Sequence, residues 1–72
     1  MQLSDVKKGS RVKIKKILEN KEIKIKLSSL SIFVDTELTI IKNDFGAIIL
    51  AVGENRVILG RGLAKKIEVE LI

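Results

Sequence analysis

The stretch that decides the fold is residues 47–59, which read AIILAVGENRVIL. Two apolar, β-rich runs, Ala47–Val52 and Arg56–Leu59, flank the turn residues 53–55. Runs of this length on either side of a glycine-containing turn are typical of a β-hairpin. Because Ala47–Val52 is apolar on both faces, we expect it to be the central and most buried strand of a sheet.

Segments on both sides of this hairpin also predict strands. Residues 10–17 alternate, with Val12 and Ile14 on one face and basic side chains on the other, which indicates a half-buried strand with a basic outer face. Residues 38–42 are rich in β-formers. In residues 67–71, Ile67, Val69 and Leu71 would face inward against two glutamates, giving a final strand.

One short helix is expected between the first two strands. Ile23, Leu27 and Leu30 fall at i, i+4 and i+7, one face of a helix of two to three turns, and Asn20 would cap its N-terminus. The alternative is a strand, because apolar residues and lysines also alternate in residues 23–27. We favour the helix because Leu27-Ser28-Ser29-Leu30 breaks the period of two.

Turn signals separate these elements. Leu3–Gly9 reads as an opening turn in which Leu3 and Val6 fold under the sheet and Gly9 takes a positive φ. Residues 31–36 turn the chain, with Asp35 suited to left-handed backbone, and residues 43–46 turn it again. Gly60-Arg61-Gly62 breaks the chain before a possible helical turn at 63–66.

The sequence therefore predicts an all-β fold, a five-stranded SH3-like barrel with one short helix after the first strand. Five short strands hide their edges best by curling into a small barrel. Seventy-two residues fit one domain, residues 1–72, and the 46% apolar content supports a core.

Composition excludes many functions. The chain has no Cys, His, Tyr or Trp, so it lacks disulfides, thiolate ligands and the usual general base. Its longest uncharged stretch, Phe45–Gly53, has nine residues, whereas a transmembrane helix needs about 20. Charged residues stand where a signal peptide would be apolar, so we expect a cytoplasmic protein.

The net charge of +5 is unevenly distributed. Residues 1–26 carry nine basic and three acidic side chains, while residues 27–72 carry five basic and six acidic ones. A basic first third suggests either an anionic partner or a solvated lysine-rich face. Lysine outnumbers arginine eleven to three and Phe33 and Phe45 are the only aromatic residues, which argues against nucleic acid, and we expect core or turn packing to account for both.

Three blocks of the chain resemble the FeoA family of small SH3-like proteins associated with ferrous iron transport. Leu3–Gly9 followed by Val12–Ile14 resembles the family's opening. Leu27–Leu30 followed by Thr36–Ile40 resembles its middle block, and Ile58–Leu59 with Ala64–Val69 resembles its closing block.

The sequence also departs from the family pattern. Ser31 and Asp35 stand where the family usually has glycine, and residues 43–46 lack a proline that is common there. Gly60 replaces a common arginine, and Leu63 replaces a common glutamate. The last two replacements alter surface chemistry where a partner could bind.

The resemblance implies a non-enzymatic accessory protein that binds FeoB, the membrane ferrous iron transporter with a GTPase domain, through a protein–protein interface, and that holds no cofactor. Two alternatives remain: a small basic barrel that binds RNA, and a stand-alone relative of the SH3-like domain of iron-dependent repressors. A homo-oligomer is also possible, through an apolar patch or a strand edge.

A docking surface is expected on and after the helix. The candidate partner-binding residues are Lys24, Ile25, Leu27, Leu30 and Phe33. We hypothesise that Ile25 or Phe33 is partly exposed beside the lysines, because an apolar anchor within a basic rim suits an acidic partner. The alternative is that all of these apolar side chains belong to the core.

Other chemistry finds little support in the sequence. Lys24 and Ser28 form an i, i+4 pair, but a lysine on a short surface helix lacks the burial needed to activate it as a base. The carboxylates pair at most two to a strand face, Glu68 with Glu70 and Asp35 with Glu37, which suits only a weakly held cation, so we expect no metal site. Arg61 between two glycines is a speculative anion site, and a plain turn is the favoured interpretation.

Overall fold

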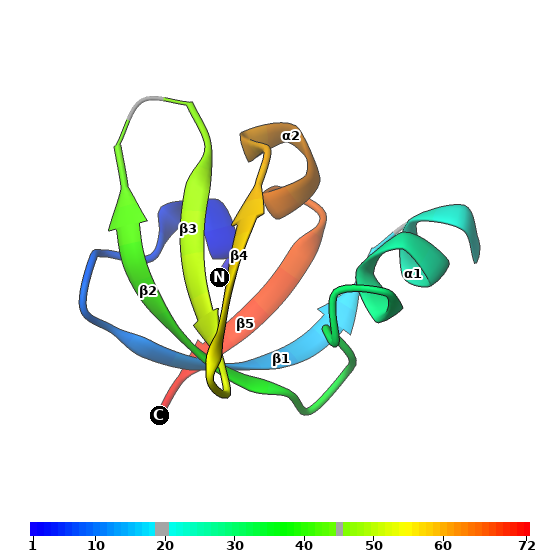
Figure 1. The fold of residues 1–72 in the computed structure, drawn as a ribbon, viewed down its shortest axis with the longest axis horizontal. Helices are drawn as coiled ribbons and strands as arrows, with labels where there is room; N and C mark the ends of the chain where they lie inside the picture. The colour runs from blue at the N-terminus through cyan, green and yellow to red at the C-terminus, as the bar shows by residue number, and fades with distance from the viewer. Residues whose placement is uncertain (19–20, 45) are drawn as a thin grey trace.

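The computed structural model describes residues 1–18, 21–44 and 46–72. In chain order its elements are η1 (Leu3–Asp5), β1 (Arg11–Ile17), α1 (Lys21–Ser28), β2 (Glu37–Asn43), β3 (Ile48–Val52), β4 (Asn55–Leu59), α2 (Arg61–Ala64) and β5 (Ile67–Leu71). The strands form one antiparallel sheet in the order β4-β3-β2-β1-β5 (Figure 1). The predicted fold class is confirmed.

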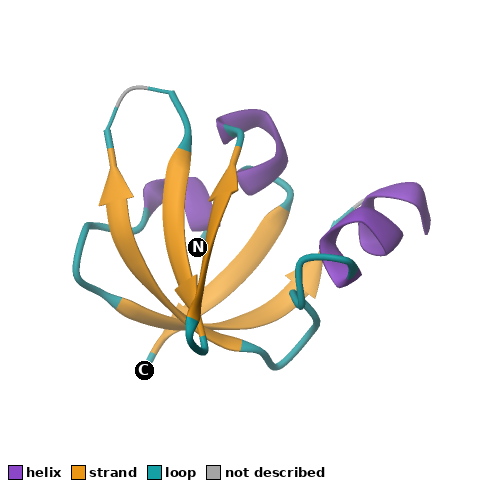
Figure 2. Cartoon of the chain, viewed as in Figure 1, coloured by secondary structure: helices purple, strands orange, loops and turns teal. Residues whose placement is uncertain are grey.

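The sheet curls around a single interior, with η1 and α2 at one rim and α1 outside the strands (Figure 2). Alternating side chains of every strand fill this interior because successive residues of a strand point to opposite faces. The buried apolar side chains are Leu3, Val6, Val12, Ile14, Ile17, Leu27, Ile32, Leu38, Ile40, Ile48, Leu50, Val52, Val57, Leu59, Ala64, Ile67 and Val69.

Two β-bulges bend the sheet. The β1–β5 register shifts between Ile14 and Lys16, and the β2–β3 register shifts between Ile40 and Lys42. An extra residue in one strand increases its local bend and twist. In β1 the shift also lets two consecutive lysines face solvent and returns Ile17 to the interior.

The β3–β4 hairpin forms as predicted, with Val52 opposite Asn55 across a two-residue turn. Of the two turn residues only Gly53 has a positive φ, +61°, as a type II′ turn requires. The expectation that this run is the most buried strand is confirmed, since β3 has no exposed residue and every other strand has at least one, but the expectation that it is central is wrong. The central strand is β2, and the outer face of β3 is only half-buried, because nothing but solvent lies beyond the barrel wall.

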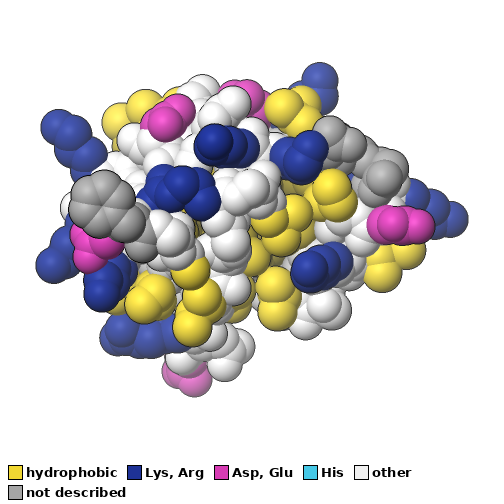
Figure 3. Space-filling view, turned by 90° about the horizontal axis from the view of Figure 1, so that it is seen from above, with side chains coloured by type: hydrophobic (Ala, Val, Ile, Leu, Met, Phe, Trp, Pro, Cys, Tyr) yellow, Lys and Arg dark blue, Asp and Glu magenta, His cyan; other side chains and the backbone are white. Residues whose placement is uncertain are grey.

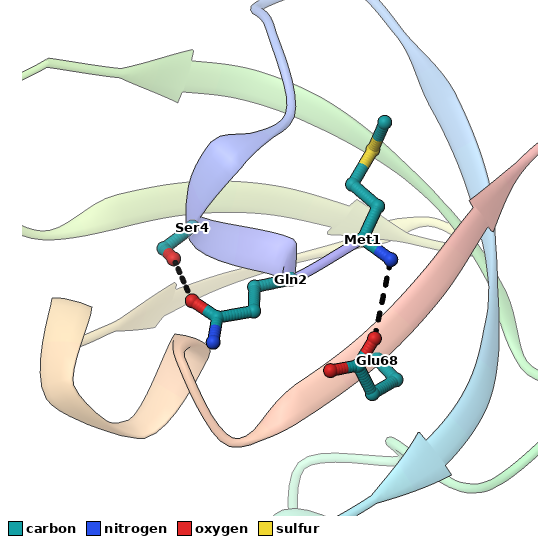
Figure 4. A network of polar contacts seen from close by, with 4 residues as sticks. All are labelled: Met1, Gln2, Ser4 and Glu68. Atoms are coloured by element: carbon teal, nitrogen blue, oxygen red, sulfur yellow. Dashed lines mark hydrogen bonds and ion pairs between the residues drawn. The ribbon is translucent and has the colours of Figure 1, made fainter.

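The N-terminal residues cover the outer edge of β5. Gln2 forms a bridge with Glu68, and the Val69 N–H donates to the Met1 carbonyl at 2.8 Å. The α-ammonium of Met1 lies 3.1 Å from Glu68 Oε2, and the Ser4 hydroxyl lies 3.5 Å from Gln2 Oε1 (Figure 4). Below this segment Leu3 and Val6 are buried, as the sequence predicts.

Two predictions about the C-terminal part need correction. Leu71 is 58% exposed rather than buried, because the end of β5 has run past the interior that Ile67 and Val69 fill. The last helical turn is α2, two residues earlier than the predicted 63–66.

Candidate functional site

Helix α1 projects from the side of the barrel, away from β3 and β4 (Figure 1). Its length matches the predicted helix, whereas the predicted cap, Asn20, lies outside the described residues. Leu27 is the helix's fully buried residue, and Ile23 and Leu30 pack half-buried against the core. The predicted inward face is therefore confirmed, but one side chain carries most of the attachment.

A Schellman motif ends the helix. The Ile32 N–H donates to the Leu27 carbonyl at 2.9 Å, and the Ser31 N–H donates to the Ser28 carbonyl at 3.0 Å. Leu27 and Ile32, both buried, make the apolar contact that accompanies this motif. Ser31 takes the left-handed position with φ +63°, where glycine is the usual residue.

The outer face of α1 carries an isoleucine. Ile25 is 58% exposed, and at 100° per residue it lies about 160° around the helix axis from the buried Leu27. Lys21 and Glu22 lie one turn before it, and Lys24 and Lys26 stand on opposite flanks. The most outward position of α1 is thus apolar, with three lysines and one glutamate around it.

Two more exposed apolar side chains follow on the loop to β2. Phe33 is 53% exposed and Val34 is 51% exposed. The loop is fixed on both sides of them: Ile32 is buried, and the Asp35 N–H donates to the Ile14 carbonyl at 2.8 Å. The Phe33 N–H also donates to Thr36 Oγ1 at 3.1 Å. We call Ile25, Phe33 and Val34, with Lys21, Lys24 and Lys26, the α1–β2 surface.

The predicted partner residues divide into two groups. Lys24, Ile25 and Phe33 are exposed, which confirms the hypothesis that Ile25 or Phe33 is partly exposed. Core packing of Phe33 is therefore wrong, although the residue does begin a turn, and Phe45 lies outside the described residues. Leu27 is 0% exposed and therefore offers no surface to a partner, which corrects its assignment. Leu30 is half-buried against the core. Val34 is a further exposed apolar residue that the sequence pattern does not single out, because no periodicity applies to an irregular loop.

Two of the four basic side chains of β1 are paired with carboxylates on neighbouring strands. Arg11 pairs with Glu37 at 3.0 Å, and Lys15 pairs with Glu70 at 3.6 Å. By contrast, the three lysines of the α1–β2 surface form no ion pair with any residue that the structure describes. Positive charge without an ion pair to a described residue therefore lies on α1, and also at Lys13 and Lys16 of β1.

Arg61 has a structural role in the barrel. Its guanidinium donates to the Ser4 carbonyl at 3.3 Å, to Asn43 Oδ1 at 2.6 Å and to the Asp44 carbonyl. The Asn43 amide donates in turn to the carbonyls of Ser4 and Val6. An open hollow of about 600 Å³ adjoins this network, but three N–H donors of Arg61 are already engaged within the fold, which favours the turn over the anion site.

The remaining candidates for chemistry are also engaged in the fold. The Ser28 hydroxyl donates to the Ile25 carbonyl at 2.7 Å, so the Lys24–Ser28 pair shows no serine–lysine contact. Glu68 pairs with the Met1 ammonium and Glu70 with Lys15, while Asp35 is left-handed rather than extended. Residues 1–18, 21–44 and 46–72 contain no group of three acidic, His or Cys side chains that could hold a metal ion.

Several solved structures are similar to this chain. A crystal structure of an iron uptake regulatory protein (FeoA) has 25% identity and a TM-score of 0.94, with 100% of this chain and 97% of that chain covered. A FeoA-like protein from Clostridium acetobutylicum has 26% identity and a TM-score of 0.88, with 100% and 86% covered. A manganese-dependent transcriptional repressor has 23% identity and a TM-score of 0.91, and this chain spans 41% of it.

The repressor likeness shows the shared SH3-like fold alone. No curated protein matches the chain. In the part of the chain that the structure describes, neither α1 nor α2 has the length and apolarity to span a bilayer.

The FeoA domain family matches residues 1–71, and this range includes the three blocks quoted from the sequence. The chain therefore belongs to the FeoA family of small accessory domains, and this membership supports a role in iron transport.

Proposed function

We propose that this protein is a non-enzymatic, cytoplasmic accessory protein of ferrous iron transport that binds the cytosolic part of a FeoB-type transporter through the α1–β2 surface. The observation that carries the proposal is the exposure of Ile25 on the outermost face of α1, among lysines without ion pairs. Family membership supports a role in iron transport, and the α1–β2 surface is where the transporter would bind.

A protein interface suits this arrangement of side chains. Exposed apolar residues rimmed by polar ones mark interaction sites, and a few apolar or aromatic anchors carry most of the binding free energy. On the face of the molecule seen in Figure 3, apolar side chains lie between lysine and arginine side chains on the half that carries α1. Such a surface fits a partner with an apolar site and acidic surroundings.

The test is a titration of isotope-labelled protein with the soluble GTPase-bearing domain of the cognate transporter, followed by backbone amide shifts at two salt concentrations. We expect shifts confined to residues 21–34 that persist at the higher salt. Ile25→Asp should abolish them. Ile58→Asp is the matched control, because Ile58 is 68% exposed on β4, outside this surface. Shifts confined to other residues would show that the α1–β2 surface is not the binding site.

A complete lack of shifts with the wild-type protein would count against the interaction itself. The alternatives then predict different results. An RNA-binding barrel would bind single-stranded RNA with an affinity that falls steeply with salt. Of the four basic side chains of β1, Arg11 and Lys15 already have carboxylate partners, which lowers the charge that this strand offers to phosphates.

A further inference from the structure

The α1–β2 surface combines two features that act at different ranges. Ile25, Phe33 and Val34 offer apolar contact, which acts only once surfaces touch. The lysines at 21, 24 and 26 offer positive charge, which acts over about 8–10 Å at physiological ionic strength. Among the described residues of α1 itself, Glu22 is the one acidic side chain.

Resting on the function proposed above, we infer that the occupant of this surface is an acidic protein segment that places an apolar side chain between carboxylates. The apolar residue would pack on Ile25, and the carboxylates would lie against Lys24 and Lys26 on the two flanks of α1. Charge complementarity selects this occupant over a second copy of the chain, because two copies would bring like-charged lysines together.

The shape of α1 also argues against a lipid bilayer. A helix that lies on a membrane turns a broad apolar face toward the lipid. The apolar residues Ile23 and Leu27 of α1 face the barrel instead, which leaves Ile25 as its single outward apolar side chain. The sequence has no Trp or Tyr to act as an interfacial anchor.

Because the charges act at longer range than the apolar contacts, we expect the two to control different rate constants of binding. Charges around a docking site speed the encounter of the two proteins and make the association rate sensitive to salt. Apolar anchors act after contact and determine the dissociation rate. The lysines of α1 should therefore control association, and Ile25 and Phe33 should control dissociation.

The experiment measures both rate constants for binding to the transporter's soluble GTPase-bearing domain. Lys24→Glu/Lys26→Glu should lower the association rate constant about 10-fold and change dissociation less than about 3-fold. Ile25→Asp should raise the dissociation rate constant about 10-fold or more. Lys7→Glu/Lys8→Glu is the matched control, because it changes the net charge equally at exposed positions outside α1.

Each outcome separates this inference from the proposed function. If the control slows association as much as the α1 variant does, the net charge alone steers binding and the inference is wrong. If the α1 variants bind the domain as well as the wild type does, the interaction with the transporter is supported and the inference of an acidic partner segment is wrong. If the wild type does not bind the domain but binds phosphatidylglycerol vesicles through Lys24 and Lys26, both the proposed function and this inference are wrong.

Discussion

The β3–β4 hairpin and the α1–β2 segment are both rich in apolar residues, yet they are held in opposite ways. In the hairpin, Ile48, Leu50 and Val57 each lie in the interior with paired strands around them. In α1 only Leu27 is fully buried, and the segment continues through two left-handed residues, Ser31 and Asp35. The hairpin supports the fold, and the α1–β2 segment can use its apolar side chains for binding.

The largest effect is expected from truncation within the barrel. Leu50→Ala should lower the free energy of unfolding by about 2–5 kcal/mol, since it removes buried methyl groups from a closely packed interior. Urea unfolding measures the loss. Ile58→Ala, on the exposed face of the neighbouring strand, should change the free energy by less than about 0.5 kcal/mol. Equal losses in the two variants would show that the interior is not the source of stability.

Truncation of the helix anchor should have a smaller and more local effect. Leu27→Ala removes the one fully buried side chain of α1, and the helix can then open while the strand ladder stays paired. Amide hydrogen exchange should quicken across residues 23–30 and stay slow in β2 and β3. If the strands lose protection to the same degree, α1 and the barrel unfold as one unit, and the contrast between the two regions disappears.

The same contrast explains how far sequence reasoning reaches. Alternation in β1 and in the hairpin predicts the fold because each interior residue is specified by a repeating pattern and by its neighbours in the sheet. A period of two treats Ile25 and Leu27 alike, whereas the helical spacing of Ile23, Leu27 and Leu30 places Leu27 inward and leaves Ile25 exposed, as the structure has them. The bulge after Ile14 shows in the sequence only as the consecutive Lys15 and Lys16, which interrupt the alternation, and its register against β5 is defined by the fold.

The functional residues illustrate a second limit. Arg61 stands between two glycines and looks available for an anion, but its acceptors belong to Ser4, Asn43 and Asp44, which are far away in the sequence. Only the folded topology brings these groups together. The family resemblance, by contrast, depends on blocks that are local in sequence, and so it could be read before the structure.

The smallest effect concerns the junction of the two regions. Ser31 has φ +63°, a backbone conformation that costs an L-residue roughly 1–2 kcal/mol in the folded state. Glycine removes this strain, but its greater backbone freedom in the unfolded chain lowers the free energy of unfolding by about 0.4–1 kcal/mol. Ser31→Gly should therefore raise stability by about 0.5–1 kcal/mol in urea unfolding, whereas Ser28→Gly, inside α1, should lower it by a similar amount.

The decisive readout is where the gain from Ser31→Gly lies. Because Ser31 is the left-handed residue of the Schellman motif and its N–H donates to the Ser28 carbonyl, exchange should slow first at the amides of α1 and much less in the barrel. A stiffer α1 holds Ile25 in one position, so the same variant should bind the transporter domain at least as tightly as the wild type. Weaker binding would show that the partner requires α1 to move, and that this departure from the family's glycine favours function over stability.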